Sequence, residues 1–373
     1  MKKALLITID FPPRVGGVAN YLSNICSNVP SDKIVVLVSK EKKSDEFDKK
    51  QSYKIYRHKL LFKYLPLKWL RAFWPVLKIV RKEKIEIIHT SHVLPIGYVA
   101  YLFKKAFKIP YIVYTHGLDI LHPQSNDRKK HWLKKILQNA EQVIANSSFT
   151  ANEVNKLGIQ QEKIKIINPC LDLSEYQEPT EEDIKKLKSK YNLENKKVLL
   201  TIGRLVERKG IDMVIKSLPE VLKQIPNLVY VIAGNGSDKK RLEGLIKECN
   251  LENKVIFVGK IELEKLNLYY SLADIFIMAS RQLANGDVEG FGIVYLEANL
   301  YGKPVIAGRS GGVPDAVEDG VNGLLVNPES VEEISKAIIK LFQDQELYNS
   351  LAEQGRTRVN GKFICRDFGG LLK

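Results

Sequence analysis

The chain has 373 residues, of which 45% are hydrophobic, and a formal net charge of +15. This length is enough for two domains, because a single hydrophobic core seldom grows beyond roughly 250 residues. No apolar run approaches the roughly 18 residues that span a bilayer, so the composition argues against an integral membrane protein.

The positive charge is concentrated in the first half of the chain. Residues 1–170 contain 30 Lys and Arg against 13 Asp and Glu, a net charge of +17, and the remainder carries −2. Such asymmetry indicates an anionic partner, either nucleic acid or a membrane surface. The sequence has no signature of a common nucleic-acid-binding module, so we expect no nucleic-acid partner.

The four cysteines are widely scattered. Cys26, Cys170, Cys249 and Cys365 form no CxxC pair and no Cys/His cluster. Their spacing predicts neither a disulfide framework nor a zinc site. A reducing cytoplasm is therefore the expected compartment.

The first predicted element is a buried strand at ALLITI, residues 4–9. Its apolar run is only about seven residues long and meets Asp10 without a cleavage site, which argues against a signal peptide. Further strand-like runs follow at KIVVLVS, IEIIH, YIVYTH and QVIANS, with amphipathic stretches of helical length between several of them. This alternation predicts a parallel sheet covered by helices.

A second α/β domain follows a polar stretch. Residues 171–196 are charged and poor in strand signals, and we interpret them as a linker. Strand-like runs resume at VLLTIGR, LVYVIAGNG, VIFVGK, DIFIMAS, PVIAG and GLLV. The sequence predicts doubly wound domains over 1–170 and 197–354, with the active site in a cleft between the carboxyl ends of the two sheets.

Each domain has candidate phosphate-binding residues after its first strand. Gly16 and Gly17, in FPPRVGGVANYL, would let backbone N–H groups approach a phosphate. Arg204 and Lys209, in GRLVERKG, place two cations before a helix, where they suit a diphosphate. A plain tight turn and an ordinary solvated loop are the respective alternatives.

The stretch GDVEGFGIVYLEA contains two candidate ligand-binding acids. Glu289 lies in the loop after DIFIMAS, where it can accept sugar hydroxyls, and Glu297 lies in the following helix, where it can hold a ribose diol. A solvent-facing Glu297 is the alternative. His116 ends the strand YIVYTH and is expected to point into the cleft.

These segments together resemble a known family. FPPRVGGVANYL, THGLD, NSS, GRLVERKG, AGNG and EGFGIVYLE, in this order, are similar to the retaining glycosyltransferases of family 4. That family has the GT-B fold of two facing Rossmann-like α/β domains. GDVEGFGIVYLEA is particularly similar to phosphatidylinositol mannosyltransferases and to bacterial lipopolysaccharide and exopolysaccharide glycosyltransferases.

The resemblance implies a role for each candidate residue. Arg204 and Lys209 would bind the donor pyrophosphate, Glu289 and His116 the donor sugar, and Glu297 the ribose. Gly16 and Gly17 would close on the pyrophosphate from the other domain. The remaining implied binding residues are Gly234 in AGNG, Gly259, Lys260 and Ile261 near the base, and Phe291, Gly292, Ile293 and Val294 through their amides. No DxD motif is present, so we expect no metal and no cofactor.

The implied function is retaining transfer of a hexose, with mannose favoured, to a lipid-linked or polysaccharide acceptor in bacterial cell-envelope synthesis. The donor would be GDP-mannose or a UDP-sugar, and no side-chain nucleophile is required. Two alternatives stay open. One is a soluble transferase with a small phosphorylated acceptor, and the other is a non-catalytic regulator that binds nucleotide sugars.

Two further segments carry expectations. Residues 53–84 interleave Lys and Arg with Leu, Phe, Tyr and Trp, a composition typical of interfacial helices. We expect peripheral binding to the anionic inner face of the plasma membrane, unless these aromatics are core. In the family the chain ends with a helix that packs back on the first domain, and we expect it to be short or altered here because the tail, 355–373, contains four glycines: Gly355, Gly361, Gly369 and Gly370.

Overall fold

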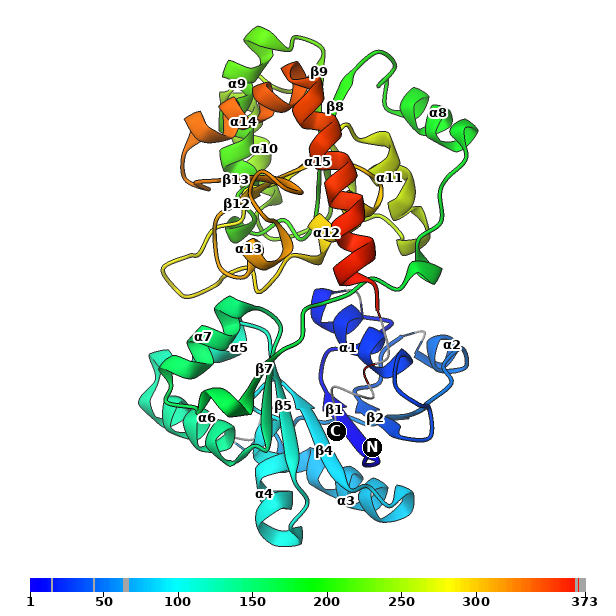
Figure 1. Ribbon diagram of the computed structural model, residues 1–373, viewed down its shortest axis with the longest axis vertical. Helices are drawn as coiled ribbons and strands as arrows, with labels where there is room; N and C mark the ends of the chain where they lie inside the picture. The colour runs from blue at the N-terminus through cyan, green and yellow to red at the C-terminus, as the bar shows by residue number, and fades with distance from the viewer. Residues whose placement is uncertain (15, 43, 63–66, 366–367, 369–373) are drawn as a thin grey trace. The chain divides into compact units, whose positions relative to one another are not determined.

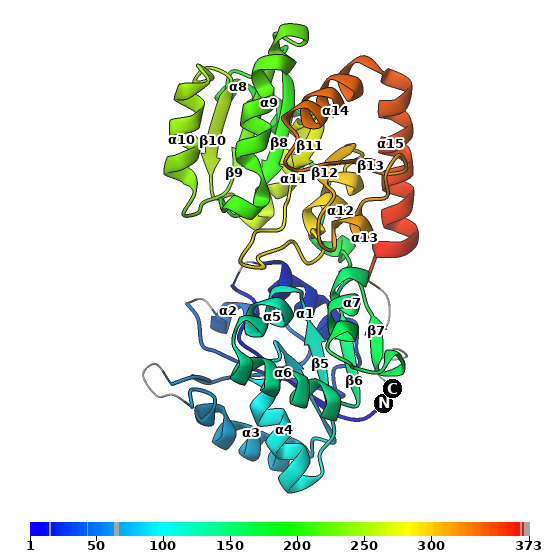
Figure 2. The same cartoon turned by 90° about the vertical axis from the view of Figure 1, so that its left-hand side faces the viewer.

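The computed structural model describes residues 1–14, 16–42, 44–62, 67–365 and 368. These residues form two compact units, each a parallel sheet covered by helices (Figures 1 and 2). The first unit contains Met1–Cys170 together with Cys365 and Phe368, and the second contains Leu171–Ile364. The predicted doubly wound α/β architecture is confirmed.

The first unit has a seven-stranded sheet in the order β3-β2-β1-β4-β5-β6-β7, in which all pairs are parallel. Its strands are β1 (Ala4–Thr8), β2 (Ile34–Val38), β3 (Lys54–Arg57), β4 (Ile87–Ser91), β5 (Tyr111–Thr115), β6 (Gln142–Ala145) and β7 (Ile164–Ile166). Its α-helices are α1 (Gly17–Ser27), α2 (Ser44–Asp48), α3 (Leu70–Glu83), α4 (Gly97–Phe107), α5 (Leu118–Leu121), α6 (Asp127–Asn139) and α7 (Ser148–Lys156).

The five strand-like runs predicted for this unit are all present, as β1, β2, β4, β5 and β6. The two edge strands, β3 and β7, escaped prediction because they are short, partly exposed and mixed in composition. β3 lies inside the segment 53–84, which was expected to be interfacial helix. That segment is strand at β3 and helix at α3, and residues 63–66 between them lie outside the described part of the chain.

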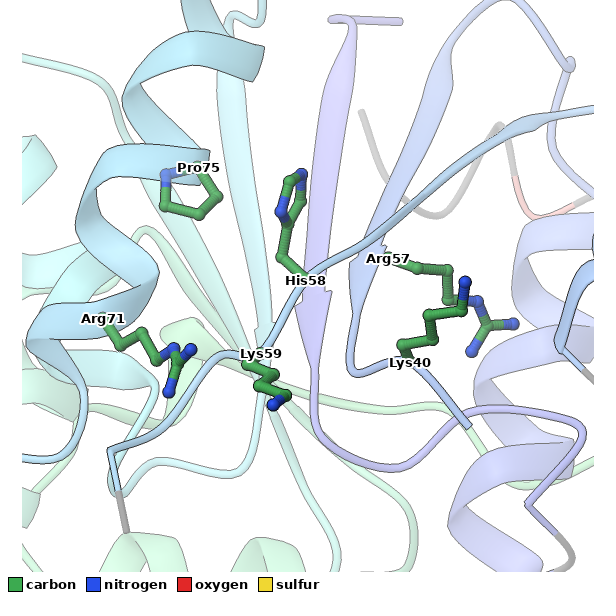
Figure 3. A pocket seen from close by; sticks show the side chains of 6 residues that line it. All are labelled: Lys40, Arg57, His58, Lys59, Arg71 and Pro75. Carbon is green, nitrogen blue, oxygen red and sulfur yellow. The ribbon is translucent and has the colours of Figure 1, made fainter. Parts of the chain in front are cut away.

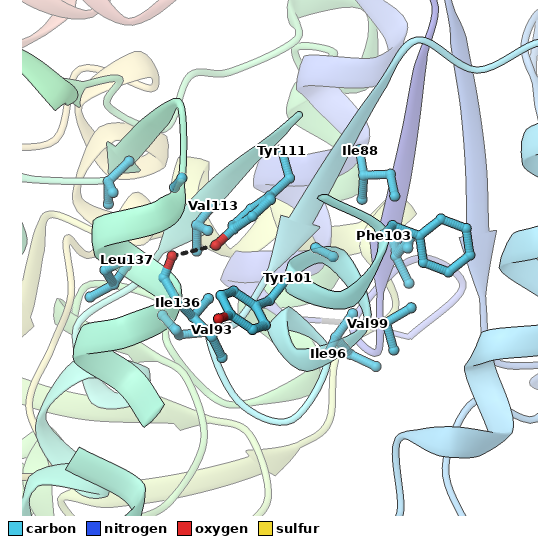
Figure 4. Close-up of a cluster of buried hydrophobic side chains, with 14 of the residues drawn as sticks. Ile88, Val93, Ile96, Val99, Tyr101, Phe103, Tyr111, Val113, Ile136 and Leu137 are labelled. Carbon is cyan, nitrogen blue, oxygen red and sulfur yellow. Dashed lines mark hydrogen bonds between the residues drawn. The ribbon is translucent and has the colours of Figure 1, made fainter. Parts of the chain in front are cut away.

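Successive residues of the sheet supply two separate cores. Leu5 and Ile7 of β1 pack with α3, α4, α6 and α7, whereas Ala4 and Leu6 pack with α1 on the opposite face. Figure 4 shows the first of these cores, where the Tyr111 hydroxyl donates a hydrogen bond to the carbonyl oxygen of Ile136 at 2.5 Å. This bond satisfies a buried polar group that would otherwise cost free energy.

The second unit has a six-stranded parallel sheet in the order β10-β9-β8-β11-β12-β13. Its strands, all six of them predicted, are β8 (Lys197–Ile202), β9 (Leu228–Ala233), β10 (Val255–Gly259), β11 (Ile275–Met278), β12 (Val305–Gly308) and β13 (Gly323–Val326). Its α-helices are α8 (Glu181–Lys190), α9 (Ile211–Gln224), α10 (Lys239–Glu248), α11 (Leu266–Leu272), α12 (Ile293–Leu300), α13 (Val313–Ala316), α14 (Val331–Gln343) and α15 (Gln345–Arg358).

Residues 171–196, expected to be a linker, lie in the second unit and include α8, which packs near α11. In each sheet the strand order reverses beside the first strand, between β1 and β4 and between β8 and β11. Open α/β sheets bind ligands at the carboxyl ends of the strands at such switch points.

The helix α15 is the last described α-helix of the second unit, and the expected alteration of a helix packed on the first unit stays a prediction. α15 runs without interruption through Gly355, and a π-helical turn, Val359–Phe363, follows it. A Cβ at Gly355 would lie 2.7 Å from Nδ2 of Asn299 on α12, so this glycine permits close packing of two helices. Gly369 and Gly370 lie outside the described residues.

The expectation that the cysteines form no disulfide is wrong. Cys170 and Cys365 are bonded to each other, while Cys26 and Cys249 are free thiols. The two bonded residues are 195 positions apart in the chain. Spacing carries no information about such a pair, because the fold alone brings the two positions together. The cysteine pattern therefore no longer supports a reducing compartment.

Candidate active site

The site in the second unit begins with the loop after β8. A 3-10 turn, Glu207–Lys209, leads to Gly210 at φ 65°, and a Cβ on Gly210 would lie 1.9 Å from the carbonyl oxygen of Ala279. Only glycine allows this approach. The backbone contact brings Lys209 beside the loop that follows β11.

Lys209, Arg208 and Glu289 form a buried ionic cluster at the β8/β11 switch point. Oε2 of Glu289 lies 2.5 Å from Nζ of Lys209 and 2.6 Å from Nη1 of Arg208. Nε of Arg208 also lies 3.1 Å from Oδ1 of Asp287. The side chains of Lys209, Arg208 and Glu289 are at most 13% exposed. The structure therefore brings together Lys209 and Glu289, two of the predicted site residues.

The charges in this cluster shift one another's protonation. Burial alone would raise the pKa of Glu289, but the charges of Lys209 and Arg208 and their hydrogen bonds outweigh it and lower the pKa to about 2. Burial lowers the pKa of Lys209, and the nearby cations add to this effect while Glu289 opposes it. Glu289 is thus a carboxylate at neutral pH.

Arg204 stands apart from this cluster. Its side chain is exposed, and it forms no ion pair with any residue that the structure describes. Arg208, by contrast, was not among the predicted site residues. The only available signal was its position next to Lys209, since the 3-10 turn directs both side chains inward.

The glycines around Glu289 fix its backbone. Gly292, at φ 93°, precedes α12, and a Cβ there would lie 2.5 Å from the Tyr295 ring. A Cβ on Gly311, at φ 55°, would lie 2.4 Å from the Glu289 carbonyl oxygen, which accepts a hydrogen bond from N of Gly312 at 2.9 Å. Bare backbone here lets two loops pack closely against Glu289.

The residues at the start of α12 have different environments. Phe291 is buried and packs edge-on against Phe363, with ring centroids 5.9 Å apart. Ile293 and Val294 are half-buried and open the helix, which has no side-chain cap and no acid in its first turn. Such a helix start favours an anion.

Glu297 is buried on α12, so the solvent-facing alternative is wrong. Tyr176 donates a hydrogen bond to its Oε1 at 3.0 Å, and Tyr270 donates one to its Oε2 at 2.5 Å. Burial raises the pKa of Glu297, and the two tyrosine hydrogen bonds oppose that rise. Sequence reasoning missed both tyrosines, and no spacing rule connects either of them to Glu297.

Gly234 and Gly259 lie together at the ends of their strands. The Gly234 N–H donates to the Gly259 carbonyl oxygen at 2.7 Å, and a Cβ on Gly234 would lie 1.8 Å from the carbonyl oxygen of Gly203. Gly234 thus has a packing role that is independent of any ligand. Of the next two predicted residues, Lys260 is exposed and Ile261 is half-buried.

Gly16 and Gly17 begin α1 in the first unit and are exposed. A Cβ on either glycine would meet no atom within 4 Å, and Gly16 has an extended φ of 168°. No contact within the described chain therefore requires glycine at these two positions. Phosphate binding by Gly16 and Gly17 therefore stays a prediction.

His116 is buried directly after β5. Its Nε2 lies 2.9 Å from Oγ of Ser91, and its ring centroid lies 5.3 Å from that of His92. Burial lowers the pKa of His116 well below its usual value, so the ring is neutral at pH 7. Nε2 of His92 lies 3.3 Å from Oδ2 of Asp10, which joins the ends of β4 and β1 at the switch point of this sheet.

Two doubly wound units, each with polar side chains gathered at its switch point, define the GT-B class of glycosyltransferases. Two family models match the chain: "Glycosyltransferase Family 4" over residues 15–175 and "Glycosyl transferases group 1" over residues 183–358. Together they span most of its length. The chain belongs to the family 4 glycosyltransferases, and it is a glycosyltransferase by class.

Similar proteins support this assignment. The chain is 29% identical over 360 residues to the GDP-mannose-dependent alpha-(1-6)-phosphatidylinositol monomannoside mannosyltransferase of Mycolicibacterium smegmatis, covering 94% of this chain and 92% of that enzyme. It is 29% identical over 378 residues to the GDP-mannose-dependent monoacylated alpha-(1-6)-phosphatidylinositol monomannoside mannosyltransferase of Corynebacterium glutamicum, covering 100% and 97%.

The fold matches solved structures over the whole chain. The crystal structure of Anabaena Alr3699/HepE in complex with UDP superposes with a TM-score of 0.83 at 22% identity, covering 99% of this chain and 98% of that one. At this identity the likeness concerns the fold. No helix of the described residues has both the length and the apolar character needed to cross a membrane.

Proposed function

We propose that this chain transfers a hexose, with mannose favoured, from a nucleotide-diphosphate sugar to a lipid-linked or polysaccharide acceptor of the bacterial cell envelope. The proposal includes retention at the anomeric carbon and independence from metal ions and cofactors. The relatives from Mycolicibacterium and Corynebacterium favour GDP-mannose and a lipid acceptor by their names. A UDP-sugar is the alternative donor.

The observation that carries the proposal is the charge at the β8/β11 switch point. The loop after β8 contributes Arg204, Glu207, Arg208 and Lys209, and the loop after β11 contributes Arg281, Asp287 and Glu289. These four cations and three acids leave one positive charge in excess, and Arg204 has no acidic partner among the described residues. This arrangement suits the pyrophosphate of a donor and the negative charge of a departing nucleoside diphosphate.

The other residues take the roles that the family resemblance implies. Glu289 holds hydroxyls of the donor sugar, Glu297 holds the ribose, and the amides at the start of α12 face sugar and phosphate. His116, which is neutral, donates or accepts a hydrogen bond at the sugar without carrying charge. Gly16 and Gly17 approach the pyrophosphate from the first unit.

The proposed chemistry needs no side-chain nucleophile. The acceptor hydroxyl attacks the anomeric carbon on the face from which the diphosphate leaves, the bond from that carbon to the phosphate oxygen breaks, and a phosphate oxygen takes the hydroxyl proton. Arg204 and Lys209 stabilise the negative charge of the leaving group. A product of inverted anomeric configuration, seen by NMR, contradicts this mechanism.

We further propose that the enzyme works in the cytoplasm on the inner face of the plasma membrane. α3 carries basic residues together with exposed Leu70 and Trp74, which are 39% and 66% exposed. This combination favours contact with an anionic bilayer surface.

A thermal-shift panel tests the donor site. UDP, GDP, ADP and their hexose conjugates are each added with and without magnesium. A ligand at about a hundred times its dissociation constant stabilises the folded state by roughly 2.7 kcal/mol. We expect a shift with one nucleoside diphosphate, unchanged by magnesium and lost in Lys209→Ala. A panel without any shift contradicts the donor-site proposal and favours a chain that does not bind nucleotide sugars.

A further inference from the structure

Four polar side chains form a continuous row of contacts across three adjacent strands of the first unit. Asp10 follows β1, Ser91 ends β4, His92 comes next, and His116 follows β5. Nε2 of His92 lies 3.3 Å from Oδ2 of Asp10, and Nδ1 of His92 lies 3.2 Å from Oγ of Ser91. The same Oγ lies 2.9 Å from Nε2 of His116. The contacts therefore connect Asp10 to His116 through His92 and Ser91.

The backbone holds His92 in this row. Its φ is 69°, in the left-handed region that residues other than glycine seldom adopt, and its N–H donates to the carbonyl oxygen of Tyr114 at 3.3 Å. Ser91 is fully buried, and the side chain of His92 is 17% exposed. Such a backbone conformation persists only where the surroundings enforce it, and it is common at functional sites.

His116 takes part in the row with only one of its two ring nitrogens. Nε2 faces Ser91, whereas Nδ1 forms no hydrogen bond with another described residue. The ring packs edge-on against Tyr21, with ring centroids 5.8 Å apart, and the residue is 9% exposed. Nδ1 is therefore the nitrogen that is available to a ligand.

The Ser91 hydroxyl couples the two histidines because it has a single hydrogen. The carboxylate oxygen of Asp10 beside Nε2 of His92 favours a proton on that nitrogen, so a neutral His92 has its lone pair on Nδ1. Ser91 then donates to this lone pair and accepts from the Nε2–H of His116. His116 is left with a lone pair on Nδ1.

A proton on His92 reverses every hydrogen bond of the row. Protonated His92 donates from both ring nitrogens, so Ser91 accepts from His92 and donates to Nε2 of His116. The protons balance, because one proton enters at Nδ1 of His116, the Nε2 proton passes to Ser91, and the Ser91 proton passes to Nδ1 of His92. The positive charge then lies on His92 beside Asp10, and His116 stays neutral, in agreement with its lowered pKa.

We propose that Asp10, His92 and Ser91 are positioning residues that set the hydrogen-bonding role of His116. With neutral His92, Nδ1 of His116 accepts a hydrogen bond from a hydroxyl of the donor sugar, and with protonated His92 the same nitrogen becomes a donor. The sugar as ligand rests on the proposed function. The exchange between the two forms of His116 involves residues of the first unit alone.

The other charged groups near His92 come from two elements. On the β1 side, Nη1 of Arg14 lies 2.9 Å from Oδ1 of Asp10. On the β5 side, Oδ1 of Asp119 accepts a hydrogen bond from N of His116 at 2.8 Å. Burial raises the pKa of Asp119, and His92 lowers it. Titration of Asp119 is therefore a second source of pH dependence, which must be separated from that of His92.

NMR of the full chain with isotope-labelled histidine tests the coupling, since a ring nitrogen with a proton and one with a lone pair have different chemical shifts. We expect the lone pair of His116 on Nδ1 at about pH 8.5 and on Nε2 at about pH 5.5. The change should follow the protonation of His92 in the same spectra. The signals of His116 are identified by their loss in His116→Gln.

Two variants show whether the effect passes along the row. Ser91→Ala keeps the titration of His92 and should abolish the change at His116. His92→Asn removes the titrating ring at a positive φ that asparagine tolerates, and it should abolish the change as well. His58→Asn is the matched control and should leave the change intact, because His58 is an exposed histidine of the same unit that lines the basic pocket in Figure 3.

The spectra overturn the coupling in either of two cases. One is a wild-type His116 that keeps the same form at both pH values, a result that does not depend on whether the variants fold. The other is a change that persists in His92→Asn, because it then comes from Asp119 or another group.

Fluorinated donors test the contact with the sugar. GDP-mannose analogues with fluorine in place of one sugar hydroxyl cannot donate a hydrogen bond at that position. At about pH 8.5 one analogue should bind about fivefold more weakly than GDP-mannose because it cannot donate to Nδ1 of His116. This deficit should disappear at about pH 5.5 in the wild type and should not vary with pH in His92→Asn.

The two halves of the proposal fail separately. A His116 that changes form in the spectra while no analogue shows a pH-dependent deficit refutes the contact with the sugar. If GDP-mannose does not bind at all, the favoured donor of the proposed function is refuted, and the coupling of His92 to His116 stands on the NMR result.

Discussion

Two arginines four positions apart in the loop after β8 differ in what their side chains contact. Arg208 is buried between Glu289 and Asp287, whereas Arg204 is exposed and forms no ion pair within the described residues. Arg208→Ala leaves Asp287 without its cation, and we expect it to lower the free energy of unfolding by about 3 kcal/mol.

Arg204→Ala is the matched control. It should change stability by no more than about 0.5 kcal/mol, yet abolish most of the nucleotide-dependent thermal shift if Arg204 binds the donor pyrophosphate. Urea unfolding and the nucleotide panel measure the two effects separately. Equal stability losses for both variants contradict the different roles assigned to them.

The Lys209–Glu289 pair makes stability depend on pH in a specific window. Glu289 has its pKa lowered to about 2 in the folded chain, so its contribution is fully present above about pH 4.5 and is lost as the pH falls toward 2. We compare the wild type with Lys209→Met/Glu289→Gln, which removes both charges. When the pH falls from about 7 to about 4, the wild type should lose roughly 1 kcal/mol of unfolding free energy relative to the double variant.

A flat difference between these two pH values contradicts the prediction and indicates a Glu289 with an ordinary pKa. The double variant is the right reference because Glu289→Gln alone leaves Lys209 buried without its partner. That lysine would then titrate and add its own pH dependence.

The sequence predicted this site in part, for a physical reason. Lys209 and Glu289 follow strands that meet at one switch point, so the β/α alternation alone places them close together. Tyr176 and Tyr270 touch Glu297 from 121 and 27 positions away, and only the packing of one loop and one helix brings them there. Contacts of that kind depend on details that residue types and spacing do not encode.

At the scale of elements, two glycines with opposite environments give a paired prediction. Gly210→Ala places a Cβ at positive φ and against the carbonyl of Ala279, so it should destabilise the fold by roughly 3 kcal/mol or more. Gly244 lies inside α10 with open space around it, and Gly244→Ala should stabilise by about 0.5–1 kcal/mol. Urea unfolding of the two variants checks both signs.

Strands were predictable where the sequence shows a continuous apolar run. The central strands read as continuous apolar runs, whereas β3 reads as a mixture because it lies at a sheet edge and is partly exposed. Gly355 lies inside α15 although glycine usually weakens a helix, because it lets α15 approach Asn299 closely. Tertiary packing outweighed local propensity at that position.

At the scale of the whole molecule, the chain passes between its two units twice, at residues 170–171 and 364–365. This connectivity determines how the disulfide affects unfolding. The two connecting segments are bonded to each other within each unit. In the first unit Cys170 is bonded to Cys365, and in the second unit N of Leu171 donates to the carbonyl oxygen of Phe363 at 2.7 Å. While the second unit is folded, its own hydrogen bond already holds the ends of the long loop together.

This arrangement predicts which unfolding step the disulfide stabilises. When the oxidised chain unfolds completely, the disulfide still closes a loop over 195 positions. Because this loop restricts the unfolded chain, the disulfide stabilises the folded state by up to about 5 kcal/mol. A step that unfolds the first unit alone gains little from the disulfide, because the loop ends stay together. We therefore expect Cys170→Ser/Cys365→Ser, or reductant, to lower the free energy of complete unfolding and to leave a step confined to the first unit nearly unchanged.

Denaturation in urea, followed with and without reductant, checks this expectation. Cys249→Ser is the control, since its thiol is free and half-exposed, and reductant should affect that variant as it affects the wild type. Thiol titration of the unfolded protein, prepared without reductant, should find the two free cysteines and not four. Four reactive thiols, or an equal shift of every unfolding step, contradict the prediction, because a bond between Cys170 and Cys365 acts on the long loop only when both units are unfolded.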